Sequence, residues 1–150
     1  MNPEREIEIL VDHPDAESFP LDALRDLALF AIDQEPGGED LLSVTILLAN
    51  DVRVRELHRD FMGLDSETDI ITFPADLEPG LQGHGGDIVI SVDAARENGA
   101  EVGHSTWEEA RFLAVHGILH LCGWNDHDAV SRATMLARQS EIIGQFDERG

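Results

Sequence analysis

The chain has no lysine, one cysteine and no apolar run long enough to cross a membrane. All ten basic residues are arginines, against 31 acidic residues, so the formal net charge is −21. This balance argues against broad nonspecific attraction to nucleic acid, because phosphate binding normally draws on clustered lysine and arginine. The lone cysteine, Cys122, excludes an internal disulfide. No secretory leader is recognisable, and we therefore expect a cytoplasmic protein.

The length of the chain limits the number of domains. With 150 residues, of which 42% are hydrophobic, it can form one real core but not two comfortable ones. No repeat or low-complexity segment divides the sequence. We therefore predict a single domain over residues 1–150.

Strand and helix patterns are mixed along the chain. Apolar residues alternate or run together over 5–11, 41–48, 69–74 and 87–91, which predicts four strands, the third of them ended by Pro74. Helices are expected from Pro20 to a stop at 36–38, and over 52–61, 93–98, 106–122 and 128–143, with Gly99 closing the third. A loop is expected over 75–85. These elements predict an α+β (mixed α/β) fold on a mixed sheet of about four strands.

The helix that starts near residue 106 carries two histidines. Ser105-Thr106-Trp107-Glu108 matches a capping box, which marks the start of the helix. From Phe112 to Cys122 the helix is apolar around almost its whole circumference, except at His116 and His120. Side chains four residues apart leave the same face of a helix, so both imidazoles can meet one metal ion. The alternative is a pair of core histidines satisfied by hydrogen bonds alone.

The residues after this helix supply a third candidate ligand. Gly123 is expected to end the helix in the left-handed conformation and to bring Asp126 and His127 within reach of the pair. Three ligands leave a position for water, as catalytic sites do. Imidazole suits zinc and several other transition metals, so one zinc ion is the first expectation. We interpret Cys122 as a small packed hydrophobe.

Three blocks of sequence carry a family resemblance. Residues 65–74, DSETDIITFP, are similar to a segment of the form D-x-x-T-D-V-L-S-F-P, and residues 86–91, GDIVIS, to a strand G-D-I-x-I-S. The third block joins Gly103-His104-Ser105 and Glu108 to the segment 115–123, VHGILHLCG. From about Leu42 onward the chain resembles the YbeY family of bacterial metal-dependent endoribonucleases.

The resemblance implies a function and a set of partners. It implies a zincin-like metal site on the two-histidine helix, with a C-terminal helix behind it, that cleaves single-stranded RNA. It further implies a role in maturation of the 16S rRNA 3′ end and in ribosome quality control. The expected partners are rRNA precursors and the ribosome or its small-subunit proteins, with no DNA and no membrane.

The sequence departs from the family pattern at the third ligand. The third histidine of the family falls ten positions after the first, where this chain has Asp126, and His127 follows one position later. In strict register Asp126 is the third ligand, whereas a one-residue bulge would make it His127. We favour Asp126, because the spacing from Gly123 is then unaltered and a carboxylate is an acceptable zinc ligand. His127 then becomes a candidate proton shuttle.

A second departure is Met62, where many relatives have an arginine thought to assist catalysis. Arg59, three residues earlier on the expected helix, is the candidate replacement. The Arg53, Arg55 and Arg59 cluster is otherwise read as a solvated helix face paired with nearby acids. If no arginine faces the metal, the ion must carry most of the stabilisation of the developing charge.

Two other functions are open at this point. A zinc peptidase would have its general-base glutamate directly after the first histidine, where this chain has Gly117. A noncatalytic ribosome-assembly factor with a structural metal is favoured by the acidic charge and by Met62.

Overall fold

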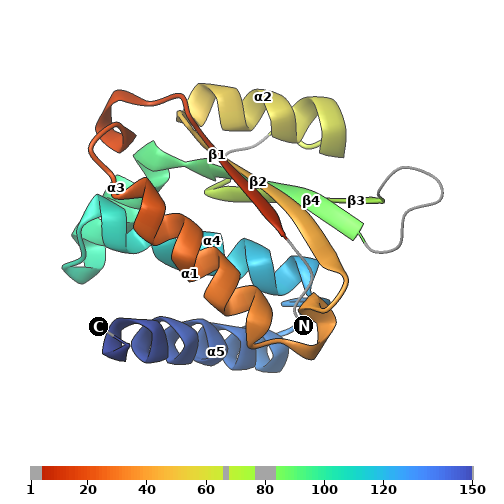
Figure 1. The fold of residues 1–150 in the computed structure, drawn as a ribbon. Helices are drawn as coiled ribbons and strands as arrows, with labels where there is room; N and C mark the ends of the chain where they lie inside the picture. Colours follow the sequence, from red (N-terminus) through yellow and green to blue (C-terminus); the bar gives the residue numbers. More distant parts are fainter. Residues whose placement is uncertain (1–4, 66–67, 77–83, 150) are drawn as a thin grey trace.

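A four-stranded sheet in the order β1-β2-β4-β3 forms the centre of the fold (Figure 1). The computed structural model describes residues 5–65, 68–76 and 84–149. Three strands run parallel, and the edge strand β3 runs antiparallel to β4. The strands are β1 (Glu6–Val11), β2 (Leu41–Ala49), β3 (Ile70–Asp76) and β4 (His84–Ser91). The predicted mixed sheet of about four strands in an α+β fold is confirmed.

Helices cover both faces of this sheet (Figure 1). On one face lie α1 (Leu21–Asp33) and α4 (Thr106–Leu121), and α5 (Ala129–Glu148) packs against both from outside. On the other face lies α2 (Asp51–Met62). Helix α3 (Val92–Val102) follows β4 and packs against α4. Two short 3-10 helices, Pro14–Ala16 and Pro36–Gly38, lie in the connections that flank α1.

The apolar core has two parts, one on each face of the sheet. The larger joins the sheet to α1, α4 and α5 and includes Ile88 and Leu119, both fully buried. The smaller lies under α2 and includes Val54, Ile71 and Val89. Successive side chains of a strand point to opposite faces, which is why Ile88 and Val89 serve different parts of the core. Among the described residues, no helix combines the length and apolar composition that a membrane crossing needs.

The prediction that Pro74 ends the third strand is wrong, because β3 continues to Asp76. The N–H of Ser91 donates to the carbonyl of Asp69 at 2.9 Å. In an antiparallel ladder alternate residues are paired in this way, so the backbones of Ile70, Thr72 and Pro74 face the free edge. Proline has no N–H, and at an outward position of an edge strand its absence costs the sheet no hydrogen bond.

Three other boundaries differ from the prediction. Helix α3 passes through Gly99 and ends before Gly103, whose φ is +78°. A Cβ at Gly99 would lie 2.7 Å from the His104 carbonyl oxygen, so this glycine allows close packing rather than a helix end. The expected loop at 75–85 is strand at both ends, and residues 77–83 lie outside the described residues. The last helix continues beyond residue 143 to Glu148.

Candidate metal centre

Helix α4 carries the two histidines to the edge of the sheet. Its capping box is present: the Ser105 side chain accepts from the Glu108 N–H, and the Glu108 side chain accepts from the Ser105 N–H. Gly117 lets the helix approach β4 closely, because a Cβ there would lie 2.8 Å from Cγ2 of Ile88. Between Leu113 and Leu121 every residue is buried except His116 and His120, and these two partly buried imidazoles face a cleft.

A tight turn after α4 brings a carboxylate to the two imidazoles. Gly123 has φ +102°, which favours glycine, and the N–H of Trp124 donates back to the Leu119 carbonyl at 3.0 Å. The Nε2 atoms of His116 and His120 lie 3.0 Å apart. Oδ2 of Asp126 lies 3.5 Å from Nε2 of His116 and 3.7 Å from Nε2 of His120. Three potential ligand atoms therefore converge on one point.

Hydrogen bonds fix the tautomer of each imidazole. Nδ1 of His116 lies 2.7 Å from Oε1 of the fully buried Gln139, whose Nε2 donates to the Phe112 carbonyl at 3.2 Å. Nδ1 of His120 lies 3.1 Å from the Trp124 carbonyl oxygen. Both acceptors are oxygens, so each imidazole carries its proton on Nδ1 and a lone pair on Nε2. Burial, together with the neighbouring His116, lowers the pKa of His120 and keeps its imidazole neutral.

This arrangement suits a cation. Two lone pairs and a carboxylate oxygen face one another with no proton between the nitrogens, which is unfavourable unless a positive charge lies among them. Ligands at about 2.0–2.1 Å from a tetrahedral zinc lie roughly 3.3 Å from one another. The observed separations of 3.0, 3.5 and 3.7 Å bracket this value. Outer hydrogen bonds from Nδ1 to an amide or carbonyl oxygen are the usual support of metal-binding histidines.

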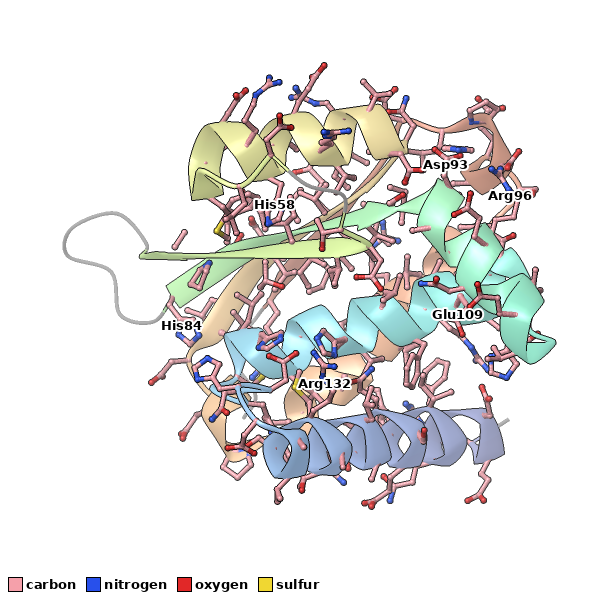
Figure 2. The ribbon with its side chains drawn as sticks, turned by 180° about the vertical axis from the view of Figure 1, so that it is seen from behind. His58, His84, Asp93, Arg96, Glu109 and Arg132 are labelled. Carbon is pink, nitrogen blue, oxygen red and sulfur yellow. The ribbon has the colours of Figure 1, made fainter. Side chains whose placement is uncertain are left out.

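The three potential ligand atoms of His116, His120 and Asp126 lie at the wall of a cleft of about 440 Å³ at the free edge of β3. Its other walls come from β3 and from α2, which contributes His58 and Met62. Figure 2 shows His58 between α2 and the sheet edge. The lining residues are His58, Met62, Thr68, Asp69, Ile70, Ile71, Thr72, Pro74, His116, His120 and Asp126. The cleft thus gives a ligand access to the site along an edge strand.

Two residues predicted to be catalytic lie outside this cleft. Arg59 is exposed and pairs with Asp60, its Nε 3.2 Å from Oδ1. The face of α2 that lines the cleft instead carries His58 and Met62. His127 is exposed and lines a neighbouring hollow next to Asp126, on the α5 side. The structure thus brings Asp126, rather than His127, to the imidazole pair, and the roles of Arg59 and His127 stay predictions.

Sequence reasoning missed Gln139 and His58. Gln139 has a signal in the sequence, because it lies between Met135 and Ile142 at helical spacing and is a polar residue on a buried stripe. The sequence contains no such signal for His58, because its approach to the cleft depends on how α2 crosses the sheet. Cys122 plays no part in the site: burial raises the pKa of its thiol to about 12, so it is a poor nucleophile and a poor ligand at neutral pH.

Known proteins are similar to this chain in sequence and in fold. The family model described as Endoribonuclease YbeY matches residues 11–147. The chain is 34% identical to an Endoribonuclease YbeY from Bacillus velezensis, over 92% of this chain and 96% of that protein. It is 38% identical to one from Moorella thermoacetica, over 88% of this chain and 89% of that protein.

A solved structure supports the fold alone. The solution structure of TM1509 from Thermotoga maritima superposes with a TM-score of 0.64 at 24% identity, and covers 93% of this chain and 88% of that one. With the family match extending over nearly all of its length, the chain belongs to the YbeY endoribonuclease family.

Proposed function

We propose that this chain is a metal-dependent endoribonuclease. It would cut single-stranded RNA at a metal ion held by His116, His120 and Asp126. One observation carries the proposal: two Nε2 lone pairs 3.0 Å apart and a carboxylate oxygen converge at an open cleft. Family membership supplies the reaction class, hydrolysis of RNA. Zinc is the first candidate for the ion, since its preferred ligands are those present.

The residues divide the work between them. His116, His120 and Asp126 would hold the ion, and Gln139 and the Trp124 carbonyl orient the imidazoles. When bound, a divalent cation supplies Lewis-acid polarisation of a phosphoryl oxygen and lowers the pKa of water. The cleft favours an unpaired strand, because bases and phosphates must splay to enter a confined site. His127, beside Asp126, is proposed to carry a proton to or from solvent.

The finer biological role follows from the resemblance. We propose maturation of the 16S rRNA 3′ end and ribosome quality control, with rRNA precursors as substrate and the ribosome or its small-subunit proteins as partners. Ribosomes are assembled in the cytoplasm, so this role carries the expected location with it. DNA is not an expected substrate.

A noncatalytic ribosome-assembly factor with a structural metal is the second candidate. It is favoured by Met62, which brings no charge to the cleft wall, and by the net charge of −21. A zinc peptidase is disfavoured, since the residue after the first histidine is Gly117, which cannot act as the general base.

Cleavage and metal content measured together test the proposal. Wild-type protein, loaded with zinc and checked by elemental analysis, is incubated with single-stranded RNA, duplex RNA, single-stranded DNA and casein. We expect cleavage of single-stranded RNA only. His120→Ala and Asp126→Ala should lose both the metal and the activity. His127→Gln should keep the metal but cleave RNA more slowly.

His104→Ala is the matched control, because His104 is exposed and pairs with Glu109 near the other end of α4. A fully metallated wild type that cleaves no RNA would contradict the nuclease and favour the assembly factor. Retention of metal by Asp126→Ala together with its loss from His127→Gln would move the third ligand to His127.

A further inference from the structure

Arg132 differs from the other arginines of the chain. Eight arginines pair with an acidic side chain, and Arg149 stacks on two phenylalanine rings. Within residues 5–65, 68–76 and 84–149, the guanidinium of Arg132 has neither kind of partner. In a chain with three times as many acids as bases, a guanidinium left unpaired is available to a ligand.

Arg132 lies beside the metal centre, on the side opposite α2. It lines a hollow between α4 and α5 together with His116, Asp126 and Gln139. It also lines the adjoining hollow that contains Asp126 and His127. Figure 2 shows Arg132 between these two helices. Its position therefore borders Asp126 from the α5 side, whereas Met62 borders the cleft from the α2 side.

Two of the acids that line these hollows with Arg132 already have partners. The Asp128 side chain caps α5 by accepting from the Ser131 N–H at 2.7 Å. Oδ2 of Asp126 faces the two imidazoles. Arg132 itself is exposed and its side chain holds no other element in place, so the fold does not depend on it.

The electrostatics of the site call for a cation there. Asp69, Glu109 and Asp126 line the same hollow as Arg132, and a phosphate approaching them is repelled. A guanidinium offers five N–H donors in a planar fork that matches two phosphate oxygens, and it keeps its charge at every physiological pH. Met62 can offer neither charge nor donor from the opposite wall.

We infer that Arg132 binds a phosphate of the RNA strand at the metal centre, from the α5 side of the site. The inference rests on the proposed function and names the chain's own source of positive charge beside the ion. Arg132 thereby supplies a phosphate contact that Met62, on the opposite wall, does not provide.

Binding of a cleavage-resistant strand tests the contact directly. The probe is a short 2′-O-methyl phosphorothioate oligonucleotide, and its Kd for zinc-loaded protein is measured between about 25 and about 200 mM salt. Loss of one phosphate contact to a single strand lowers the slope of log K against log salt by about 0.7. We expect this change for Arg132→Ala, but not for Arg132→Lys or the distant control Arg25→Ala.

Cleavage gives a second readout. With zinc content unchanged, Arg132→Ala should lower kcat/KM on single-stranded RNA by about 100-fold, the lower end of what removal of one transition-state donor costs. Arg132→Lys should recover part of the loss. Met62→Arg in the Arg132→Ala background should recover more, since it returns a guanidinium to the cleft from the other wall.

The outcomes separate this inference from the proposed function. Active wild type with an equally active Arg132→Ala of unchanged slope overturns the inference and leaves the nuclease intact. If the wild type cleaves no RNA but Arg132→Ala still lowers the slope of log K against log salt, the nuclease proposal is wrong and the phosphate site stands. Loss of zinc from Arg132→Ala, or no binding of the probe by wild type, overturns the inference.

Discussion

At the scale of single residues, Gln139 determines which nitrogen of His116 carries the proton. It is fully buried and uses both ends of its amide, with its nitrogen on the Phe112 carbonyl and its oxygen on Nδ1 of His116. Because the amide cannot rotate without breaking the first bond, the second keeps the proton of His116 on Nδ1. The Nε2 atom, which faces His120 and Asp126, is thereby held as an acceptor.

Replacement of Gln139 should therefore weaken metal binding without touching a ligand. Gln139→Leu leaves the Nδ1–H of His116 unpaired and its tautomer unspecified, and we expect about a 10- to 100-fold loss of zinc affinity. Competition with a chromophoric chelator measures this affinity. Gln139→Glu keeps an oxygen toward Nδ1 and should retain most of the affinity.

Gln145→Leu is the control for this pair, because Gln145 lies exposed on the same helix. Equal zinc affinity in Gln139→Leu and Gln145→Leu would show that the amide has no part in holding the ion.

At the scale of elements, the contact between α4 and β4 sets the position of the candidate metal centre. Gly117 stands between the two histidines in sequence and meets the fully buried side chain of Ile88. A larger residue there must push α4 away from the sheet, and with it the imidazoles that face the cleft at the edge of β3.

Gly117→Val should accordingly destabilise the fold and weaken the site together. Overpacking of a close core contact costs about 1–3 kcal/mol of unfolding free energy.

Gly144→Ala should instead stabilise the fold. A Cβ there meets no other atom, and the replaced glycine lies within a helix, so we expect a gain of about 0.5–1 kcal/mol in unfolding free energy. Urea denaturation midpoints measure both, and a Gly117→Val protein as stable as wild type would contradict the close packing.

Local signals predicted the ends of several elements correctly. The capping box at Ser105 and the left-handed Gly123 both act within a few residues of sequence. The errors at Pro74 and Gly99 have a common cause. Each residue can break regular structure, but Pro74 is tolerated because its backbone faces the open edge of the sheet, and Gly99 because α3 packs closely against the segment that begins α4. Neither arrangement is visible in the local pattern.

The candidate metal centre likewise has a part that local sequence patterns predict and a part that they do not. His116 and His120 could be found because helical periodicity alone puts them on one face, and Asp126 because a helix stop returns the chain. Gln139 and Arg132 come from α5, and their approach to α4 depends on the packing of two helices. The sequence contains the residues of that contact but not its register.

At the scale of the whole molecule, the excess of negative charge is the dominant electrostatic feature. There are 31 acids for ten arginines, and most of the arginines are already paired. Exposed pairs contribute little, about 0–1 kcal/mol each. The acids left over repel one another in the folded state, where they are closest.

Salt should therefore stabilise the metal-free protein. Screening by sodium chloride weakens this repulsion more than it weakens the exposed pairs, and we expect a gain on the order of 1 kcal/mol, or about 2–4 °C in Tm. Thermal melts from low to moderate salt measure it. The double variant Glu6→Gln, Glu8→Gln removes two exposed charges from β1 and should show a smaller rise. A Tm that falls with salt would mean that the ion pairs outweigh the repulsion.

The proline on the open edge of β3 has a consequence for solubility. A strand with unpaired backbone groups is a template on which a second chain can add its own strand and begin an aggregate. Here Pro74 has no amide proton to offer, and the hydroxyl of Thr68 occupies the Ile70 carbonyl at 3.0 Å. A foreign strand can therefore form only a broken ladder, so the cleft can stay open to a substrate without recruiting another copy of the protein.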